Sequence, residues 1–240
     1  MCGAFYVRQS PTLAAYFGLE SPSDLGEWVG REIINPRRIL DGRSEFTVFR
    51  PTDRVLVIVQ NKSGQYILQS ARWWLLMKSD VEGTLTPHQE YATFNSRIDK
   101  VMATGRTLHN TRPKSFRVLI PASGYYEWLG KVPYAIERAD GEPILFGAMA
   151  KAYPTPEGGY ELGVSIVTLP GHPKLAHIHP KSLPLMIEDN EIPHWLDRTL
   201  ANQHLHSFAT PMLKHDMNTQ PKSDIKQPEL FGELQRIAAD

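Results

Sequence analysis

The sequence predicts a single α+β domain, built on a curved, mainly antiparallel and barrel-like β-sheet with short peripheral helices. Three observations support this class. The 240 residues suffice for one domain with a sizeable core. Several short apolar runs alternate with turn signals, as strands do in sheets joined by hairpins. Nineteen prolines are scattered along the chain, so its elements are expected to be short.

The expected strands are runs rich in β-branched and aromatic residues that end at turn signals. Residues 61–64 form a hairpin turn between the first two runs, and residues 140–141 and 156–159 separate later runs. Helices are expected where apolar residues recur at a helical period. We expect strands over residues 54–60, 66–76, 116–120, 124–128, 143–150 and 160–169, and helices over residues 11–19, 97–105 and 192–200.

The chain is interpreted as one domain over residues 1–215, followed by an extension over residues 216–240. No internal repeat or long linker divides the first part. The extension is polar until residues 230–234, where Leu230, Phe231 and Leu234 introduce apolar side chains. This pattern is compatible with a short packed helix or with a partly ordered tail, and the sequence does not choose between them.

The composition excludes several classes of protein. A hydrophobic fraction of 41% with 22% charged residues is typical of globular chains, not of disordered or fibrous ones. One cysteine excludes an internal disulfide framework and an all-cysteine zinc site. No stretch approaches the roughly 20 apolar residues that span a bilayer, and the N-terminus lacks a secretory signal pattern. We expect a cytoplasmic monomer with no membrane partner and no cofactor.

The charge is balanced overall but not along the chain. Basic and acidic residues both number 26. The first 120 residues carry 16 Lys and Arg against 11 Asp and Glu, whereas the second 120 carry 10 against 15. This asymmetry indicates either a polyanion-binding face built by the first half or two interleaved halves whose charges only solvate the surface.

Cys2 follows the initiator Met1 directly and is the single thiol of the chain. Removal of Met1 would leave an α-amine and a thiol on adjacent carbons. The α-amine has a reference pKa of about 7.7–8.0, so near neutral pH far more of it is in the nucleophilic, neutral form than of a lysine amine at about 10.4. It can condense with an aldehyde, and the neighbouring thiol can then close a five-membered thiazolidine ring at high effective molarity. N-terminal nucleophile hydrolases are the other use of such a residue.

Three further segments carry residues with catalytic potential. Residues 94–97 read Phe-Asn-Ser-Arg, and residues 176–185 form a histidine-bearing loop that enters an apolar run. Residues 117–128 read as a strand, a glycine-containing turn and a second strand with Glu127 among aromatic residues. A carboxyl group packed against Tyr126 and Trp128 would be desolvated, which raises its pKa and makes it a plausible proton donor.

Together with Met1, Cys2 and Gly3, these segments resemble the SOS-response-associated peptidase family, whose members crosslink to abasic sites in DNA. The family pattern is an N-terminal Cys-Gly-Arg-Phe, an Asn-Ala-Arg box, a box ending in Gly-Tyr-Tyr-Glu-Trp, and a late Ile-His box. The corresponding boxes occur here in the same order across residues 2–185. The resemblance implies a sensor of abasic sites in single-stranded DNA that acts in the DNA damage response.

The resemblance also implies four catalytic residues. After autoproteolytic removal of Met1, Cys2 would form a thiazolidine link with the C1′ aldehyde of the abasic sugar. Glu127 would protonate the sugar ring oxygen, and His179 would assist proton transfer at the Schiff base. Asn95 would hold the Cys2 amine or the opened sugar in place. The implied activity is that of a cysteine autopeptidase with crosslinking and lyase-type DNA chemistry.

The implied DNA contacts are less complete. Arg97, with Arg106 and Lys181, would contact backbone phosphates. Trp73 is either a wall or core residue or, if exposed, a platform for a flanking base. Ala4 stands where the family usually has Arg, and the late box reads His-Pro-Lys-Ser-Leu-Pro where the family has His-x-Arg-Met-Pro. Reaction chemistry is therefore better supported than DNA affinity.

The histidines permit a second interpretation. His177 and His179 share a face of an extended segment, and His204 and His206 repeat that spacing. A catalytic metal needs about three such ligands and an open position, which the sequence does not assemble, so no metal is expected. We select His179 as catalytic because the family histidine follows isoleucine, as Ile178 precedes it here. The aromatic residues expected in the core are Tyr125, Tyr126, Phe146 and Trp195.

Two functions from other classes remain open. The first is a non-covalent DNA-binding scaffold that keeps the fold, suggested by Ala4 and the altered histidine box. The second is an N-terminal-cysteine hydrolase that acts on peptides. Replacing Cys2 by Ser distinguishes the scaffold, because a scaffold would retain DNA without any complex that resists denaturation.

Overall fold

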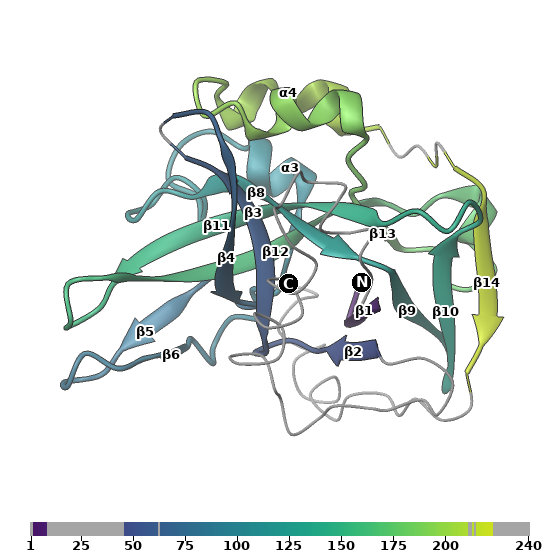
Figure 1. Cartoon of the computed structure of the whole chain (residues 1–240), viewed down its shortest axis with the longest axis horizontal. Coiled ribbons are helices and arrows are strands. Elements are labelled where there is room, and N and C mark those ends of the chain that lie inside the picture. Colours follow the sequence, from purple (N-terminus) through teal and green to yellow (C-terminus); the bar gives the residue numbers. More distant parts are fainter. Residues whose placement is uncertain (1, 9–45, 62, 211–212, 214, 223–240) are drawn as a thin grey trace.

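The computed structural model describes residues 2–8, 46–61, 63–210, 213 and 215–222 (Figure 1). Strands dominate this part of the chain, and helices are short. The predicted α+β class with a barrel-like core and peripheral helices is confirmed. The helix expected at residues 11–19 lies outside the described residues.

The first sheet brings the N-terminus into the fold. It has five strands in the order β14-β10-β9-β1-β2, and all of its pairings are antiparallel. Strand β1 has Phe5, Tyr6 and Val7 at its centre, residue types that favour strands. The strands are β1 (Ala4–Arg8), β2 (Phe46–Phe49), β9 (Gly124–Leu129), β10 (Val132–Arg138) and β14 (Met217–Pro221).

The second sheet closes on itself. Its pairings run from β11 through β8, β3, β4 and β12 and back to β11, which forms a barrel-like ring. The closing contact is parallel and pairs Gly163 with Arg72. A Cβ atom on Gly163 would lie 2.6 Å from the carbonyl oxygen of Trp74, so glycine permits this close approach. The ring strands are β3 (Arg54–Gln60), β4 (Tyr66–Arg72), β8 (Phe116–Ala122), β11 (Ile144–Pro154) and β12 (Tyr160–Pro170).

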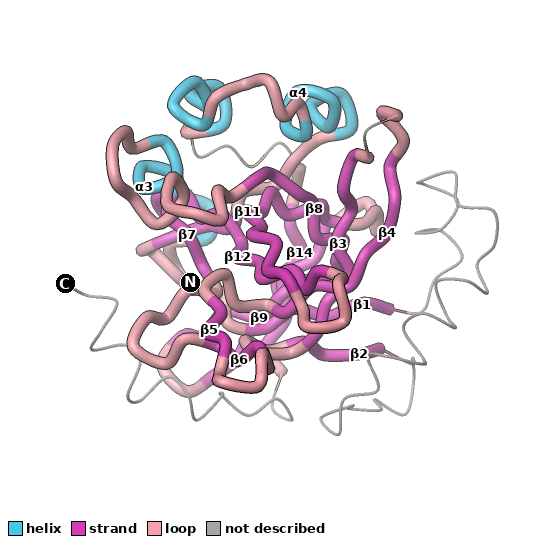
Figure 2. The backbone as a smooth tube through the Cα atoms, turned by 90° about the vertical axis from the view of Figure 1, so that its left-hand side faces the viewer, coloured by secondary structure: helices cyan, strands magenta, loops and turns pink. Residues whose placement is uncertain are grey.

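Shorter elements border the ring. Strands β7 (Asn95–Arg97) and β13 (Ser182–Pro184) both pair with the last part of β12, and β5 (Met77–Ser79) pairs with β6 (Leu85–Pro87). Helices α3 and α4 lie together on one side of the strands (Figure 2). The helical elements are α3 (Ile98–Met102), η1 (Pro173–Leu175), η2 (Asp189–Glu191), α4 (Ile192–Leu196) and η3 (Asn202–Phe208).

Two large apolar clusters fill the domain. One joins the two sheets and contains Phe5, Trp73 and Phe146, whose rings contact one another through Phe5. The other lies under the helices and contains Trp195 and Phe208 at a ring-centroid distance of 5.2 Å. The aromatic residues expected in the core are all nearly inaccessible to solvent. Burial of such side chains contributes about 1.5–3 kcal/mol each before entropy is counted.

The predicted elements differ from the observed ones mainly at their ends. The strand predicted over residues 54–60 is confirmed as β3. The strand predicted over residues 66–76 ends at Arg72, because the Trp74 N–H turns back to the Arg72 carbonyl at 2.7 Å. The helix predicted from residue 97 begins at Ile98, since Asn95–Arg97 pairs with β12 as a strand.

Strand β14 lies inside the segment expected to be an extension. Its residues pair antiparallel with β10, and the Lys222 N–H continues the contact to the Pro133 carbonyl at 2.8 Å. The segment 217–222 is therefore part of the first sheet. Within the described residues, no helix is long and apolar enough to span a membrane.

Candidate active site

Cys2 enters the interior because β1 pairs with β9. The register places Ala4 opposite Tyr126, so the chain before Ala4 continues toward the part of β9 that carries Glu127. Cys2 is completely buried, and its Sγ lies 3.7 Å from the Ala4 carbonyl oxygen. Burial raises the pKa of the Cys2 thiol well above its usual range, and the charge of Glu127 adds to the effect. In this environment the sulfur is held as a neutral thiol.

Asn95 joins Cys2 to the second sheet. Strand β7 positions it by parallel pairing with β12, where Asn95 lies opposite Ile166. Its Nδ2 donates to the Cys2 carbonyl oxygen at 3.0 Å, although 93 residues separate the two in sequence. The Asn95 Oδ1 is buried and makes no hydrogen bond with the described part of the chain. Asn95 thus holds the Cys2 backbone while one buried acceptor stays available.

Glu127 is a buried acid on β9. Only 3% of its surface is exposed, and burial raises the pKa of its carboxyl group to about 7. Near neutral pH a large fraction is therefore protonated. A protonated carboxyl group in a buried site can donate a proton, whereas an ordinary surface glutamate is fully ionised at this pH.

His179 lies in the segment that follows η1, and its side chain is close to that of Glu127. Its Nδ1 lies 3.6 Å from the Glu127 Oε2, and its Nε2 lies 3.3 Å from the Ser182 hydroxyl. Burial lowers the pKa of His179 to about 4, with the charge of Lys181 among the smaller causes. The imidazole is therefore neutral at pH 7. Burial favours the uncharged form of both Glu127 and His179, and a neutral pair of this kind suits proton transfer.

Tyr125 belongs to the same group of polar atoms, although the sequence interpretation assigned it to the core alone. It lies two residues before Glu127 on β9, so both side chains share a face of the strand. Its hydroxyl is buried without a hydrogen bond to the described residues. Burial and the nearby charges of Glu127 and Cys2 raise the pKa of Tyr125 well above its usual range. Strand alternation was the signal that could have identified it.

The basic residues expected to contact DNA lie at the surface. Arg97 is 74% exposed in its side chain and contacts Asp99 through two hydrogen bonds of 3.0 Å. Arg106 and Lys181 are also exposed. Arg97 pairs with Thr168 of β12, and Pro170 of the same strand pairs with the residue that follows Lys181. Arg97 and Lys181 therefore border the same end of β12.

Trp73 is corrected from a possible base-stacking platform to a core residue. Its side chain is completely buried, its Nε1 donates to the Phe94 carbonyl oxygen at 2.8 Å, and its ring contacts Phe5 and Phe94. A base cannot reach this ring while the core is intact. Ala4 is likewise buried, in a cluster with Tyr6 and Tyr126, so it presents nothing to a phosphate.

The alternative histidine positions are not brought together as a site. His177, His204 and His206 are exposed. Across the described ranges, no three His, Cys, Asp or Glu side chains are grouped as metal ligands would be. The residues that the fold does assemble are Cys2 with Asn95 and Glu127 with His179.

Comparison with known proteins places these residues in a family context. The family model described as SOS response associated peptidase (SRAP) matches residues 1–225. The abasic site processing protein YobE of Bacillus subtilis is 24% identical over 188 residues, covering 75% of this chain and 82% of YobE. The abasic site processing protein YoqW of Bacillus phage SPbeta is 23% identical over 184 residues, covering 73% and 77%.

Solved structures share the fold. A protein from Bordetella bronchiseptica superposes with a TM-score of 0.67 at 16% identity, covering 92% of this chain and all of that chain. A protein from Bacteroides thetaiotaomicron gives a TM-score of 0.65 at 18% identity, covering 93% of each chain. These likenesses cover more than nine-tenths of this chain, so they show that the fold is shared.

Proposed function

The chain belongs to the SOS response associated peptidase family, and from this premise we propose that it captures abasic sites in single-stranded DNA covalently through Cys2. The observation that carries the proposal is the placement of a buried thiol at the N-terminus beside a carboxyl group whose pKa is raised to about 7. The names of the two abasic site processing relatives support the same substrate. The reaction belongs to the DNA damage response.

The covalent step requires the free α-amine of Cys2. Autoproteolytic hydrolysis of the Met1–Cys2 bond consumes one water and releases methionine. The amine then adds to the C1′ aldehyde, and loss of one water gives an imine. The thiol adds across the imine, sulfur bonding to C1′ and the thiol proton passing to nitrogen, which yields a thiazolidine. The adjacent thiol is favoured over any external nucleophile because the ring closure is intramolecular.

Glu127 and His179 supply the proton transfers. The abasic sugar exists mainly as a closed ring, and protonation of the ring oxygen opens it to the aldehyde. Glu127 is the proposed donor because, with a pKa of about 7, roughly half of its carboxyl groups are protonated near pH 7. His179, neutral at this pH and 3.6 Å from Glu127, accepts and returns protons at the imine. Asn95 holds the Cys2 backbone and offers its Oδ1 to the opened sugar.

Surface arginine and lysine residues hold the strand. Arg97 and Lys181 border the same end of β12, and Arg106, exposed in the segment that follows α3, is the third expected contact. Phosphate binding by Arg97 requires exchange of its hydrogen bonds to Asp99 for bonds to DNA. A single strand is the expected substrate because an unpaired abasic nucleotide is turned into the site at little cost.

The decisive experiment is covalent capture on a denaturing gel. Protein lacking Met1, verified by intact mass, is incubated with a single-stranded oligonucleotide that carries one abasic site. We expect a shifted band that is absent with Cys2→Ser and with undamaged DNA. An exposed-residue variant, Glu157→Gln, serves as the surface control for Glu127→Gln and should crosslink like wild type. Absence of the band from correctly processed wild-type protein would overturn the proposal.

One observation favours a second candidate, a non-covalent DNA-binding scaffold. Ala4 is buried and uncharged, and Arg97 is already bonded to Asp99, so two phosphate contacts are absent or occupied. A scaffold would bind abasic and intact DNA equally, and Cys2→Ser would leave that binding unchanged. The denaturing gel and a native binding assay on the same samples separate the two functions.

A further inference from the structure

A polar pocket of about 410 Å³ lies away from Cys2, between the segment that follows α3 and the segment that follows α4. We propose that this pocket binds a phosphate group. The phosphate belongs either to a DNA strand that extends from the active site or to a small phosphate-bearing molecule. The proposal does not depend on the chemistry of Cys2. Its lining includes Lys114, Phe116, Arg117, Arg198, Thr199 and Asn202.

The lining of the pocket carries positive charge and no acidic residue. Lys114 and Arg198 are exposed at its surface, and Arg117 is buried, with 4% of its surface accessible. Neither Lys114 nor Arg198 forms an ion pair with the described residues. The nearest acid in sequence, Asp197, is outside the lining, and its carboxylate accepts hydrogen bonds from Thr199. A concave site with several cations concentrates anions.

Arg117 lines the pocket, and its side chain is fixed by hydrogen bonds. Its Nη1 donates to the Asn202 Oδ1 at 2.7 Å, its Nη2 donates to the carbonyls of Leu200 and Asp197, and its Nε donates to the Trp195 carbonyl. All of these acceptors are neutral. Burial lowers the pKa of Arg117, as expected when a cation leaves water. No carboxylate of the described residues forms an ion pair with it, and the charge of Asp197 acts on it only from a longer distance, so a bound anion would add to the compensation of a buried positive charge.

Arg198 is positioned before any ligand arrives. Its Cζ lies 4.6 Å from the centre of the Phe116 ring, a cation–π contact that restricts the guanidinium. A planar guanidinium presents paired N–H donors that match the oxygens of a phosphate. Lys114 is exposed and adds a further positive charge to the lining. Arginine and lysine side chains are the usual partners of phosphate groups, arginine through paired N–H donors and lysine as a point charge.

A short segment of the chain links the candidate active site to the pocket. Asn95 and Arg97 lie on β7, α3 follows directly, and Ala103 after α3 lines the pocket. Three strand residues and five helical residues span at most about 17 Å. The side chain of Lys100 is exposed on this path. A DNA strand whose abasic nucleotide occupies the site can therefore reach the pocket with a phosphate a few nucleotides away.

The test uses the full chain and a double charge reversal, Lys114→Glu with Arg198→Glu. The matched control reverses two exposed lysines elsewhere, Lys78→Glu with Lys131→Glu, so the net charge changes equally. One arm titrates inorganic phosphate and dAMP by NMR and follows the amide of Thr199. The other arm measures the anisotropy of undamaged single strands of 5 and 20 nucleotides across a salt series. Undamaged DNA keeps the Cys2 reaction out of both arms.

We expect phosphate binding that the double reversal weakens at least tenfold and the control leaves within twofold. If the 20-mer also loses tenfold, whether or not the 5-mer does, the phosphate can come from a DNA strand. Loss of two phosphate contacts would then reduce the salt slope by about 1.4 for single-stranded DNA. If only dAMP and phosphate binding are lost, the ligand is a small phosphate-bearing molecule.

Two results would overturn the proposal. The first is equal phosphate, dAMP and 20-mer binding by the double reversal and the control. The second is an unchanged Thr199 amide in wild type at saturating phosphate. A neutral double variant, Lys114→Gln with Arg198→Gln, repeats the test without introducing negative charge and should show the same loss. Crosslinking of a short abasic oligonucleotide, measured in parallel, reports separately on the proposed function of Cys2.

Discussion

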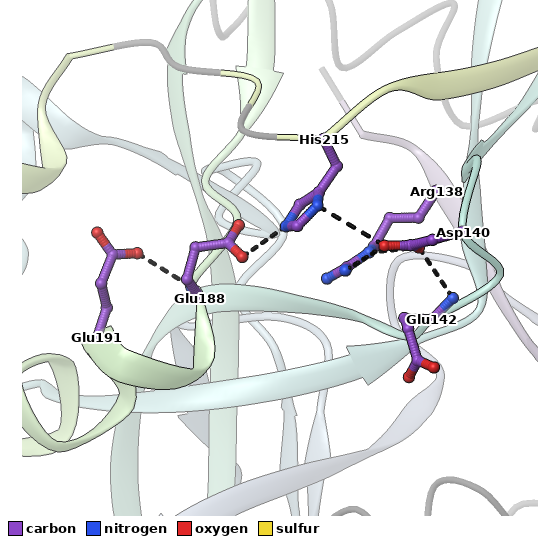
Figure 3. A network of polar contacts seen from close by, with 6 residues as sticks. All are labelled: Arg138, Asp140, Glu142, Glu188, Glu191 and His215. Carbon is purple, nitrogen blue, oxygen red and sulfur yellow. Dashed lines mark hydrogen bonds and ion pairs between the residues drawn. The ribbon is translucent and has the colours of Figure 1, made fainter.

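Two histidine–carboxylate groups in this protein lie in opposite surroundings. In the candidate active site, Glu127 is buried and lies 3.6 Å from His179. Near the surface, His215 lies 2.5 Å from Glu188 and 3.7 Å from Asp140, which also contacts Arg138 at 2.6 Å (Figure 3). Both groups pair a histidine with a carboxylate, but one is buried, whereas the other lies near the surface and also contains an arginine.

The comparison shows how burial decides the protonation state. Burial raises the pKa of Glu127 to about 7, whereas hydrogen bonds from Arg138 hold the pKa of Asp140 down at about 2. The first carboxyl group can therefore give up a proton near neutral pH, and the second remains a charged anchor. The surface group supports the attachment of β14, because the neighbouring Ala139 N–H donates to the Asp216 carbonyl at 2.8 Å.

The largest expected effect is on the rate of crosslinking. Glu127→Gln keeps the shape of the side chain but removes the acid, so the rate should fall by about 10²-fold or more. Glu188→Gln, in the surface group, should stay within twofold of wild type. Single-turnover crosslinking followed on denaturing gels measures both. Equal rates for the Glu127 variant and wild type would remove Glu127 from the reaction.

The second effect is on the free energy of unfolding. Glu127→Gln slows the reaction but should make the folded protein more stable than wild type at alkaline pH. The folded-state pKa of Glu127 lies above its unfolded value of about 4.3, so the folded protein binds more protons between these values and loses stability as pH rises toward 7. Between pH 4.5 and pH 8, the ionisation of Glu127 should cost wild type about 3 kcal/mol of its free energy of unfolding, and Glu127→Gln should not show this loss. Urea unfolding of both proteins at the two pH values measures it; parallel pH profiles would contradict a raised pKa.

The third effect concerns the pH dependence of the reaction. The crosslinking rate should decline above pH 7, by up to about tenfold per pH unit, because the protonated form of Glu127 is lost. Below pH 7 the rate should fall as the Cys2 amine becomes protonated. In Glu127→Gln the decline on the alkaline side should disappear. A decline that persists in this variant would assign the titration to another group.

The smallest effect is expected in the surface group. Asp140→Asn removes the partner of Arg138 and His215, but the site is screened by water, so the free energy of unfolding should fall by less than about 1 kcal/mol. The difference should shrink at high salt and should vanish as pH falls through about 2, where Asp140 is itself protonated. Urea unfolding at low and high salt tests this; a salt-independent loss would indicate a packing role.

The candidate site was predictable from sequence as a set of residues, but not as an arrangement. Cys2, Asn95, Glu127 and His179 were selected by their motifs, and the fold brings them together through β1, β7 and β9. Strand β1 itself was not predicted, because a five-residue strand at a chain end has too little pattern to identify alone. Its pairing with β9 is what buries the thiol.

Trp73 and Tyr125 show the limit of local patterns. An aromatic residue beside a motif reads equally as a core residue or as a stacking platform. Trp73 is a core residue because its indole N–H meets the Phe94 carbonyl, 21 residues away in sequence. Tyr125 lies in the core as expected, but its hydroxyl, near Glu127 and Cys2, makes no hydrogen bond with the described residues. The residues next to Trp73 and Tyr125 in the sequence do not indicate either feature, because each depends on segments that are distant along the chain.

By itself the sequence determined the fold class, the strongest strands and the chemical inventory of the site, because these depend on residue type and short-range order. Only the tertiary structure decided the charge states of Glu127 and His179, the burial of Trp73, the pairing of β14 with β10 and the cationic pocket around Arg117. The physical reason is that desolvation depends on which distant segments cover a group. That covering is a property of strand pairing and barrel closure, which join residues far apart in the chain.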